Sequence, residues 1–206
     1  MKLNERYGKP NAHYMKRLEE ITRYAMDDYA RILAFRVDLL LPVDNSHKGY
    51  DSAVITRFIA SLKAQIAAYL QRRRRDGKRV YPCKLRYAWV REFGELNGNK
   101  HYHMLLLVNR EVFRNTMLNT ENSAQPRGLL AGMVARAWAV ALRRTGDMAN
   151  KAPFHLPGVS YELDRRNGTN TDFFPQLHIP HQLSGEGVHQ KTRMMVNVTL
   201  VVVRDK

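Results

Sequence analysis

The sequence has few cysteines, few acidic residues and no long apolar run. Cys83 is the only cysteine among 206 residues, which excludes an internal disulfide and favours a reducing compartment. A lone thiol of this kind is expected to be a small packed residue. No stretch approaches the roughly eighteen apolar residues of a membrane span, and the start, MKLNERYGKP, lacks the apolar core of a signal peptide. These absences predict a cytoplasmic protein with no membrane partner.

Positive charge is what the chain has in excess. Lys and Arg number 34 against 19 acids, a net charge of +15 at pH 7. Residues 61–91 hold ten of these cations and one acid, Asp76. Such a segment neutralises phosphates without reading a base sequence, so it predicts a nucleic-acid partner. The alternative is a solvated helix end, where cations also favour the helix dipole.

Periodicity predicts one α+β domain. An apolar fraction of 44% is ordinary for a globular chain. We expect helices over about 10–29, from Ile55 to the arginine run, and from Leu130 to near Gly146; we expect strands over 32–41, 85–93, 101–108 and, weakly, 159–163. Neighbouring strands with interspersed helices indicate a central antiparallel sheet with helices packed on it. The expected divisions are an N-terminal helix (1–30), the main domain (31–180) and an atypical tail (181–206).

The segment REFGELNGNKHYHMLLLVN, residues 91–109, predicts a β-hairpin. Asn97-Gly98 suits a two-residue turn, because both residues tolerate positive φ. Pairing outward from that turn places Glu92 directly opposite His103, and Glu95 opposite Lys100 on the other face.

Three ligand-type side chains are thereby expected on one patch of the hairpin. His101 and His103 are two positions apart, so they project from the same strand face, and Glu92 joins them from the partner strand. Two imidazoles and a carboxylate suit a divalent cation with open positions, here Mn²⁺ or Mg²⁺. The alternative is a half-exposed strand whose histidines are incidental. Asp38, on the first strand, is a weaker candidate, which would contact the metal ligands and not the metal itself.

These residues carry a family resemblance. A carboxylate some nine positions before a His-hydrophobic-His motif resembles the HUH endonucleases of rolling-circle replication. The longer pattern AWVREFG…HYHMLLLVNR, with a later ARAWAVAL, resembles the YagK/YfjJ family of inovirus gene-two-protein-like proteins from phages and enterobacterial prophages. The resemblance covers roughly 30–180. It implies a replication-initiator (HUH) endonuclease-like fold, whose metal positions a phosphate of single-stranded DNA for attack by a tyrosine.

The chain departs from this pattern where the nucleophile is expected. The resemblance implies a tyrosine in a helical segment like SYLAK after the His motif, and no such segment occurs. Tyr161 is the only tyrosine after His103, and it lies in a strand-like sequence. Tyr161 is therefore the catalytic candidate by default, and its alternative role is a packed aromatic.

The tail suggests a reason for the departure. Residues 182–191, QLSGEGVHQK, can be encoded by codons that spell SYLAKVYTK one base later. We hypothesise that the chain after about Pro180 is a frameshifted product. Such a tail is expected to be poorly ordered, and VNVTLVVV an aggregation hazard instead of a native strand. The codons of the gene test this hypothesis.

The resemblance implies a nicking enzyme that acts at a replication origin on single-stranded DNA, in company with host replication proteins. The alternatives are a catalytically inactive DNA-binding regulator and an RNA-binding protein that stacks bases on Trp89. The candidate nucleic-acid-binding residues are Arg72, Arg73, Arg74, Arg75, Lys78, Arg79, Arg91 and Lys100.

Overall fold

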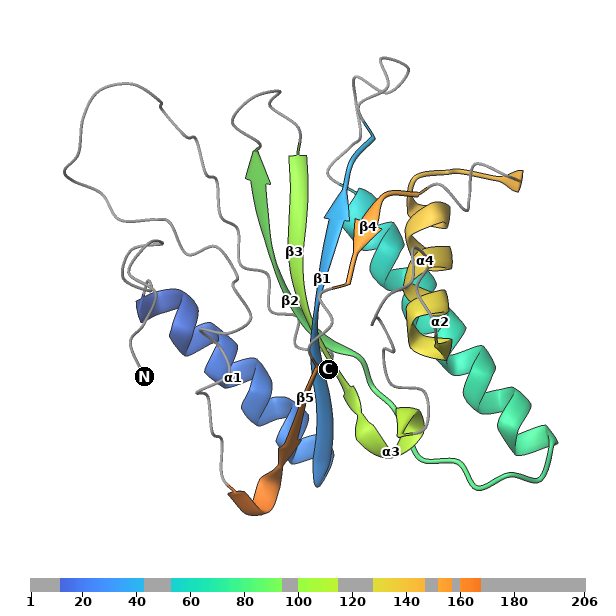
Figure 1. Ribbon diagram of the computed structural model, residues 1–206. Coiled ribbons are helices and arrows are strands. Elements are labelled where there is room, and N and C mark those ends of the chain that lie inside the picture. Colours follow the sequence, from blue (N-terminus) through green and yellow to red (C-terminus); the bar gives the residue numbers. More distant parts are fainter. Residues whose placement is uncertain are drawn as a thin grey trace.

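The computed structural model describes residues 12–42, 53–93, 100–114, 128–146, 152–156 and 160–167, which fold into helices on both faces of one sheet (Figure 1). The elements are α1 (Ala12–Asp28), β1 (Arg31–Leu40), α2 (Val54–Arg75), β2 (Arg86–Phe93), β3 (Lys100–Asn109), α3 (Arg110–Phe113), α4 (Leu129–Ala141), β4 (Phe154–His155), β5 (Ser160–Asp164) and a 3₁₀ turn (Arg165–Asn167).

Within the described residues the sheet has five strands, and each pairing among them is antiparallel. Its order is β2-β3-β1-β4, and β5 also pairs with β1. β4 and β5 share one edge of β1: β4 pairs with its end at Asp38 and Leu39, and β5 with its beginning at Arg31–Phe35. The long strands β1 and β3 are therefore the centre of the sheet.

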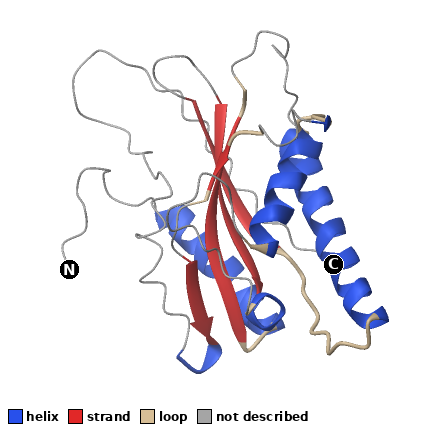
Figure 2. Cartoon of the chain, turned by 45° about the vertical axis from the view of Figure 1, so that its right-hand side comes forward, coloured by secondary structure: helices blue, strands red, loops and turns tan. Residues whose placement is uncertain are grey.

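Helices α2 and α4 cover one face, and α1 covers the other (Figure 2). Alternate residues of the central strands divide between two cores, as the period of two in a strand requires. Phe35, Val37 and Leu106 belong to the core beneath α2 and α4. Ala34, Leu105 and Leu107 belong to the core beneath α1. The N-terminal helix is thus one layer of this fold.

The helix α2 follows from its apolar stripe. Its buried residues recur at intervals of three and four positions: Val54, Ile55, Phe58, Ile59, Leu62, Ile66 and Leu70. The helix ends in a Schellman motif, with Gly77 at φ 67° and the Lys78 N–H donating to the Arg73 carbonyl at 2.9 Å. Glycine accepts this left-handed conformation without steric cost, so the chain reverses directly after the arginine run.

The expected helices and strands are confirmed within the described residues, and two short elements are additional. The sequence did not predict α3 or β4, because four and two residues are too short to show a period. Residues 97–98 and the tail 181–206 lie outside the described part of the chain.

None of the described helices has the length and apolar character needed to span a membrane. Cys83 is partly buried against the core beneath α2 and α4, and burial raises the pKa of its thiol to about 11.

Candidate metal site

The two histidines of the HYH motif lie near the start of β3, on the face that α1 covers farther down the sheet (Figure 1). Val90 pairs with His103 and belongs to the core beneath α1, which identifies the face. The His101 and His103 rings lie 5.9 Å apart between centroids, at 74° to each other. His103 is buried and His101 is partly exposed, so solvent reaches the pair at His101.

The hairpin register differs from the prediction by two residues. Glu92 pairs with His101, and His103 pairs with Val90; Phe93, in place of Glu95, pairs with Lys100. A two-residue change keeps each position on its face, because side chains alternate with a period of two. Position 92 therefore still shares a face with the histidines, now opposite His101. The Glu92 side chain lies outside the described part of the structure.

Asp38 of β1 lies opposite His103 in the register and contacts it directly. Its Oδ1 is 2.7 Å from His103 Nδ1. Arg36, two residues earlier on the same strand, donates to Asp38 Oδ1 from Nε at 2.6 Å and to Oδ2 from a terminal nitrogen at 3.0 Å. The carboxylate is thus held by a bidentate arginine and an imidazole, with all three side chains largely buried.

The contact with Asp38 favours one tautomer of His103. A carboxylate is only an acceptor, so an unprotonated Nδ1 would place two lone pairs 2.7 Å apart. We therefore assign the proton to Nδ1 and the bond to Asp38, while the terminal nitrogen of Arg36, 2.9 Å from Nδ1, donates to Asp38 Oδ2. The lone pair is then on Nε2, the arrangement found in metal-ligating histidines whose other nitrogen donates to a carboxylate.

Asp38 is a carboxylate at neutral pH. Burial acts to raise its pKa, but hydrogen bonds from His103 and Arg36 outweigh burial and lower the pKa to about 2. The charge that orients the imidazole is therefore present over the whole physiological range.

His155 approaches the same carboxylate from β4. Its Nδ1 lies 3.6 Å from Asp38 Oδ2, and the two residues are paired in the sheet. The sequence alone did not place His155 in the site, because no ligand-type residue lies at a useful spacing from it. Arg36 was missed as well, because an arginine in an apolar strand reads as an exposed residue until the pairing places it beside Asp38.

The described side chains supply two of the three ligands expected for a divalent cation, His101 and His103. Among the described side chains, no three His, Cys, Asp or Glu residues converge as a metal site. The expected third ligand, Glu92, is outside that set.

Replacing Asp38 with asparagine is expected to weaken Mn²⁺ binding by about 10- to 100-fold, because the His103 ring loses the charged acceptor that orients it. Calorimetric titration with Mn²⁺ measures the change. Asp28→Asn is the matched control. Asp28, the last residue of α1, also accepts a hydrogen bond from an arginine, Arg86 at 2.8 Å, but it lies at the end of the sheet away from the histidines. Equal affinity in Asp38→Asn and wild type would show that Asp38 does not support the metal.

Tyr161 is not brought to the histidines. Tyr161 lies on β5 and pairs with Ala34 of β1. His103 pairs with Asp38, which is four positions farther along β1. That offset alone is about 13 Å at the rise of a strand. The ring packs partly against the core beneath α1, and burial raises the pKa of its hydroxyl.

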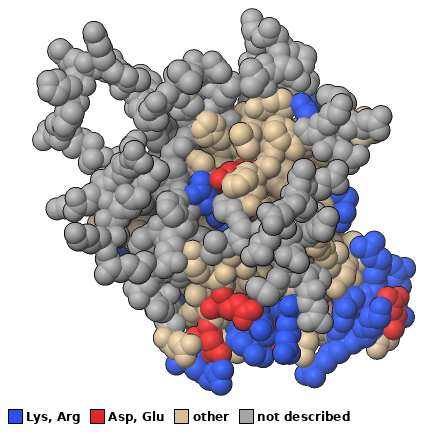
Figure 3. Space-filling model, viewed as in Figure 1, with Lys and Arg blue, Asp and Glu red and all other residues tan. Residues whose placement is uncertain are grey.

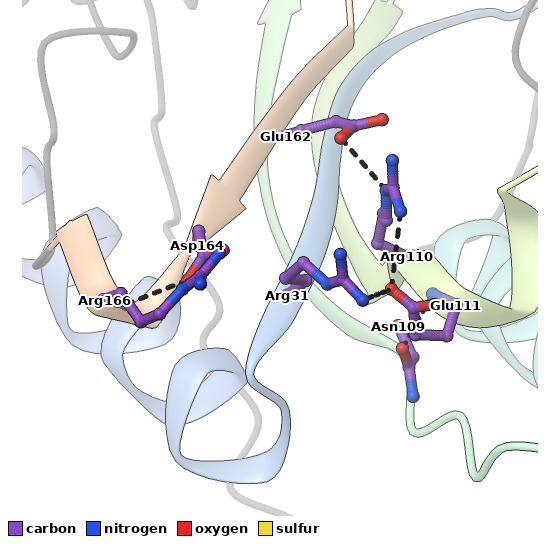
Figure 4. A network of polar contacts seen from close by, with 7 residues as sticks. All are labelled: Arg31, Asn109, Arg110, Glu111, Glu162, Asp164 and Arg166. Atoms are coloured by element: carbon purple, nitrogen blue, oxygen red, sulfur yellow. Dashed lines mark hydrogen bonds and ion pairs between the residues drawn. The ribbon is translucent and has the colours of Figure 1, made fainter.

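A polar network holds β5 in this place (Figure 4). Arg110 at the start of α3 donates to Glu162 of β5 at 3.0 Å, and Arg31 pairs with Glu111 at 2.9 Å. Asp164 accepts from Arg166 at 2.7 Å. The first two ion pairs connect β1, α3 and β5 at the end of the sheet opposite to the histidines, and the third joins β5 to the 3₁₀ turn after it.

The basic segment formed by the last turn of α2 and the residues directly after it, residues 72–79, also lies at the end of the sheet opposite to the histidines. Figure 3 shows Lys and Arg gathered around the end of α2, where Arg72–Arg75, Lys78 and Arg79 are mostly exposed. Arg91 is separate from this group: it pairs with Tyr102 and alternates onto the face opposite to His103. Lys100 pairs with Phe93, and its side chain lies outside the described residues. The structure therefore separates most of the expected DNA contacts from the expected metal.

The fold and the site define a class: an α+β protein with a five-stranded antiparallel sheet, helices on both faces, and a histidine pair on a central strand. The chain matches the family model described as the YagK/YfjJ C-terminal domain over residues 1–178, and it belongs to this family.

Two relatives from Escherichia coli (strain K12) are similar to the chain. It is 32% identical over 168 residues to "Uncharacterized protein YagK", an alignment that covers 78% of this chain and 76% of the relative. It is 27% identical over 175 residues to "Uncharacterized protein YfjJ", covering 81% and 82%. No solved structure matches the chain.

Proposed function

We propose that the chain is a metal-dependent nicking protein for single-stranded DNA, with an HUH endonuclease-like fold, of the kind that initiates rolling-circle replication of a phage or prophage. The observation that carries the proposal is the Asp38–His103 hydrogen bond beside His101 and position 92. A buried carboxylate that fixes a histidine tautomer next to a second histidine is what a metal-ligating strand needs.

The side chains divide the chemistry as follows. Asp38 and Arg36 hold the His103 ring, and His101, His103 and Glu92 would hold Mn²⁺ or Mg²⁺. When bound, the cation would polarise a phosphate of the strand and stabilise charge on the leaving oxygen. A tyrosine hydroxyl that attacks this phosphate forms a phosphotyrosine, and the broken P–O bond leaves a free 3′-hydroxyl.

A second candidate is a DNA-binding regulator without cleavage activity. The position of Tyr161 favours it, because an attacking oxygen must reach about 3–3.5 Å from the phosphorus, and the offset along β1 between the partners of Tyr161 and His103 is alone about 13 Å. RNA binding through Trp89 has less support, since Trp89 packs against Tyr102 with ring centroids 5.7 Å apart.

The test is incubation of the chain with end-labelled single-stranded DNA and Mn²⁺, followed by a denaturing gel. We expect a shortened strand and a protein–DNA adduct, both absent with EDTA. Persistence of the adduct in Tyr161→Phe would place the nucleophile elsewhere in the chain, as the offset of Tyr161 from His103 along β1 indicates. Binding without cleavage in either Mn²⁺ or Mg²⁺ would reject the nicking protein and establish the regulator.

A further inference from the structure

A second candidate site lies where the end of α2, the segment after it and α3 meet. A cavity of about 220 Å³ is lined there by three arginines, Arg73, Arg79 and Arg114, together with Tyr69, Tyr81 and Glu111. It lies beyond Asn109, the end of β3, and His103 is six residues back along that strand. At the rise of a strand, the cavity is about 20 Å or more from the histidines.

The cavity is built from cations held over aromatic rings. Arg73 lies over the Tyr69 ring, 5.8 Å from its centroid, and Arg79 lies over the Tyr81 ring at 4.8 Å. Arg73 also donates to the Tyr69 hydroxyl at 3.4 Å and to the Arg79 carbonyl at 3.3 Å. The Schellman turn at Gly77 makes this possible, because it returns Arg79 and Tyr81 alongside the last turns of α2.

The described residues that line the cavity carry a net positive charge. Glu111 is the one acid among these described lining residues, and it already pairs with Arg31 at 2.9 Å and with Arg110 at 3.5 Å. Glu111 therefore does not neutralise Arg73, Arg79 and Arg114. An anionic ligand is what this lining would attract.

We propose that this cavity binds one nucleotide unit of a single strand, with the base stacked on the Arg79–Tyr81 pair and the flanking phosphate held by the arginines. Tyr69 is the less suitable of the two tyrosines, since its ring already stacks on Phe113 with centroids 6.4 Å apart. Bases stack on aromatic rings and on guanidinium planes, and phosphates pair with arginine. The volume is below the roughly 300–1,000 Å³ of drug-sized sites, which fits a single base with its sugar. The neighbouring exposed cations would contact only backbone phosphate.

The inference rests on the single-strand binding in the proposed function, but not on the metal or on cleavage. The assay is therefore anisotropy of a labelled oligothymidylate of about twelve nucleotides, in EDTA, against an abasic strand of equal length. We expect the base-bearing strand to bind about 5- to 150-fold more tightly. Equal affinity for the two strands would overturn the inference and leave the basic segment as a phosphate contact alone.

Two arginine variants with the same change of charge localise the effect. Arg79→Gln is expected to remove most of the preference for bases, whereas Arg75→Gln, outside the lining, weakens both strands equally. Arg79 is exposed, so its replacement leaves the core intact. Retention of the preference in Arg79→Gln would overturn the assignment to this cavity. Full displacement of the strand by free thymidine monophosphate would also overturn it, in favour of a mononucleotide site.

The outcomes separate the two proposals. Base-dependent binding without any cleavage would reject the nicking protein and support the nucleotide cavity. Cleavage with no preference for bases would do the reverse.

Discussion

The His101→Ala/His103→Ala variant is expected to lose about a thousandfold or more of the Mn²⁺-dependent cleavage of single-stranded DNA. A cation on a phosphoryl oxygen supplies several kcal/mol of charge stabilisation, and about 4 kcal/mol corresponds to a factor of roughly a thousand. Removing both imidazoles leaves Glu92 as the one expected ligand. The initial rate of strand cleavage on a denaturing gel measures the loss.

The control for this variant is His13→Ala. His13 is exposed on α1 and has no place in the proposed site, so its removal tests the loss of a histidine as such. Binding of single-stranded DNA should persist in the double variant, since the basic segment lies at the other end of the sheet. Cleavage at the wild-type rate in His101→Ala/His103→Ala would show that the histidines do not hold the catalytic cation.

Trp138→Ala is expected to lower the free energy of unfolding by about 3–5 kcal/mol. Trp138 is fully buried in α4, and its ring meets Phe58 of α2 edge-on, with centroids 6.0 Å apart at 82°. Its Nε1–H donates to the Pro153 carbonyl at 2.9 Å, directly before β4. The side chain therefore packs the two helices together and anchors the strand that carries His155.

Urea denaturation followed by circular dichroism measures this loss. Trp138→Phe is the companion variant: it keeps an aromatic ring but leaves the Pro153 carbonyl without this donor, and it is expected to cost less than the alanine. A loss below about 1 kcal/mol in Trp138→Ala would mean that α4 is not essential to the core as described.

The long elements could be predicted from the sequence because their buried residues leave a clear pattern. The apolar stripe of α2 recurs every three to four residues, and β3, which is buried on both faces, is a continuous apolar run. The strand predicted at 159–163 is confirmed as β5. The helix α3 and the strand β4 are too short for any period, and tertiary contacts alone determine them.

The site could be predicted by residue type and face, but not by exact pairing. The expected register depended on Asn97-Gly98 as the turn, and the observed register pairs Glu92 with His101 instead. Arg36 and His155 could not be predicted because both contact Asp38 of β1. Asp38 is remote in sequence from His103 and His155, and only the strand pairing brings them together. The arginine–tyrosine cavity was missed for a similar reason: Arg114 lies on a different segment from Arg73 and Arg79.

The most direct test of the metal site is a calorimetric titration of the chain with Mn²⁺, beside the His101→Ala/His103→Ala variant. We expect one Mn²⁺ per chain in the wild type and no measurable binding in the variant. Equal binding in the two proteins, or none in the wild type, would contradict a metal site on this hairpin.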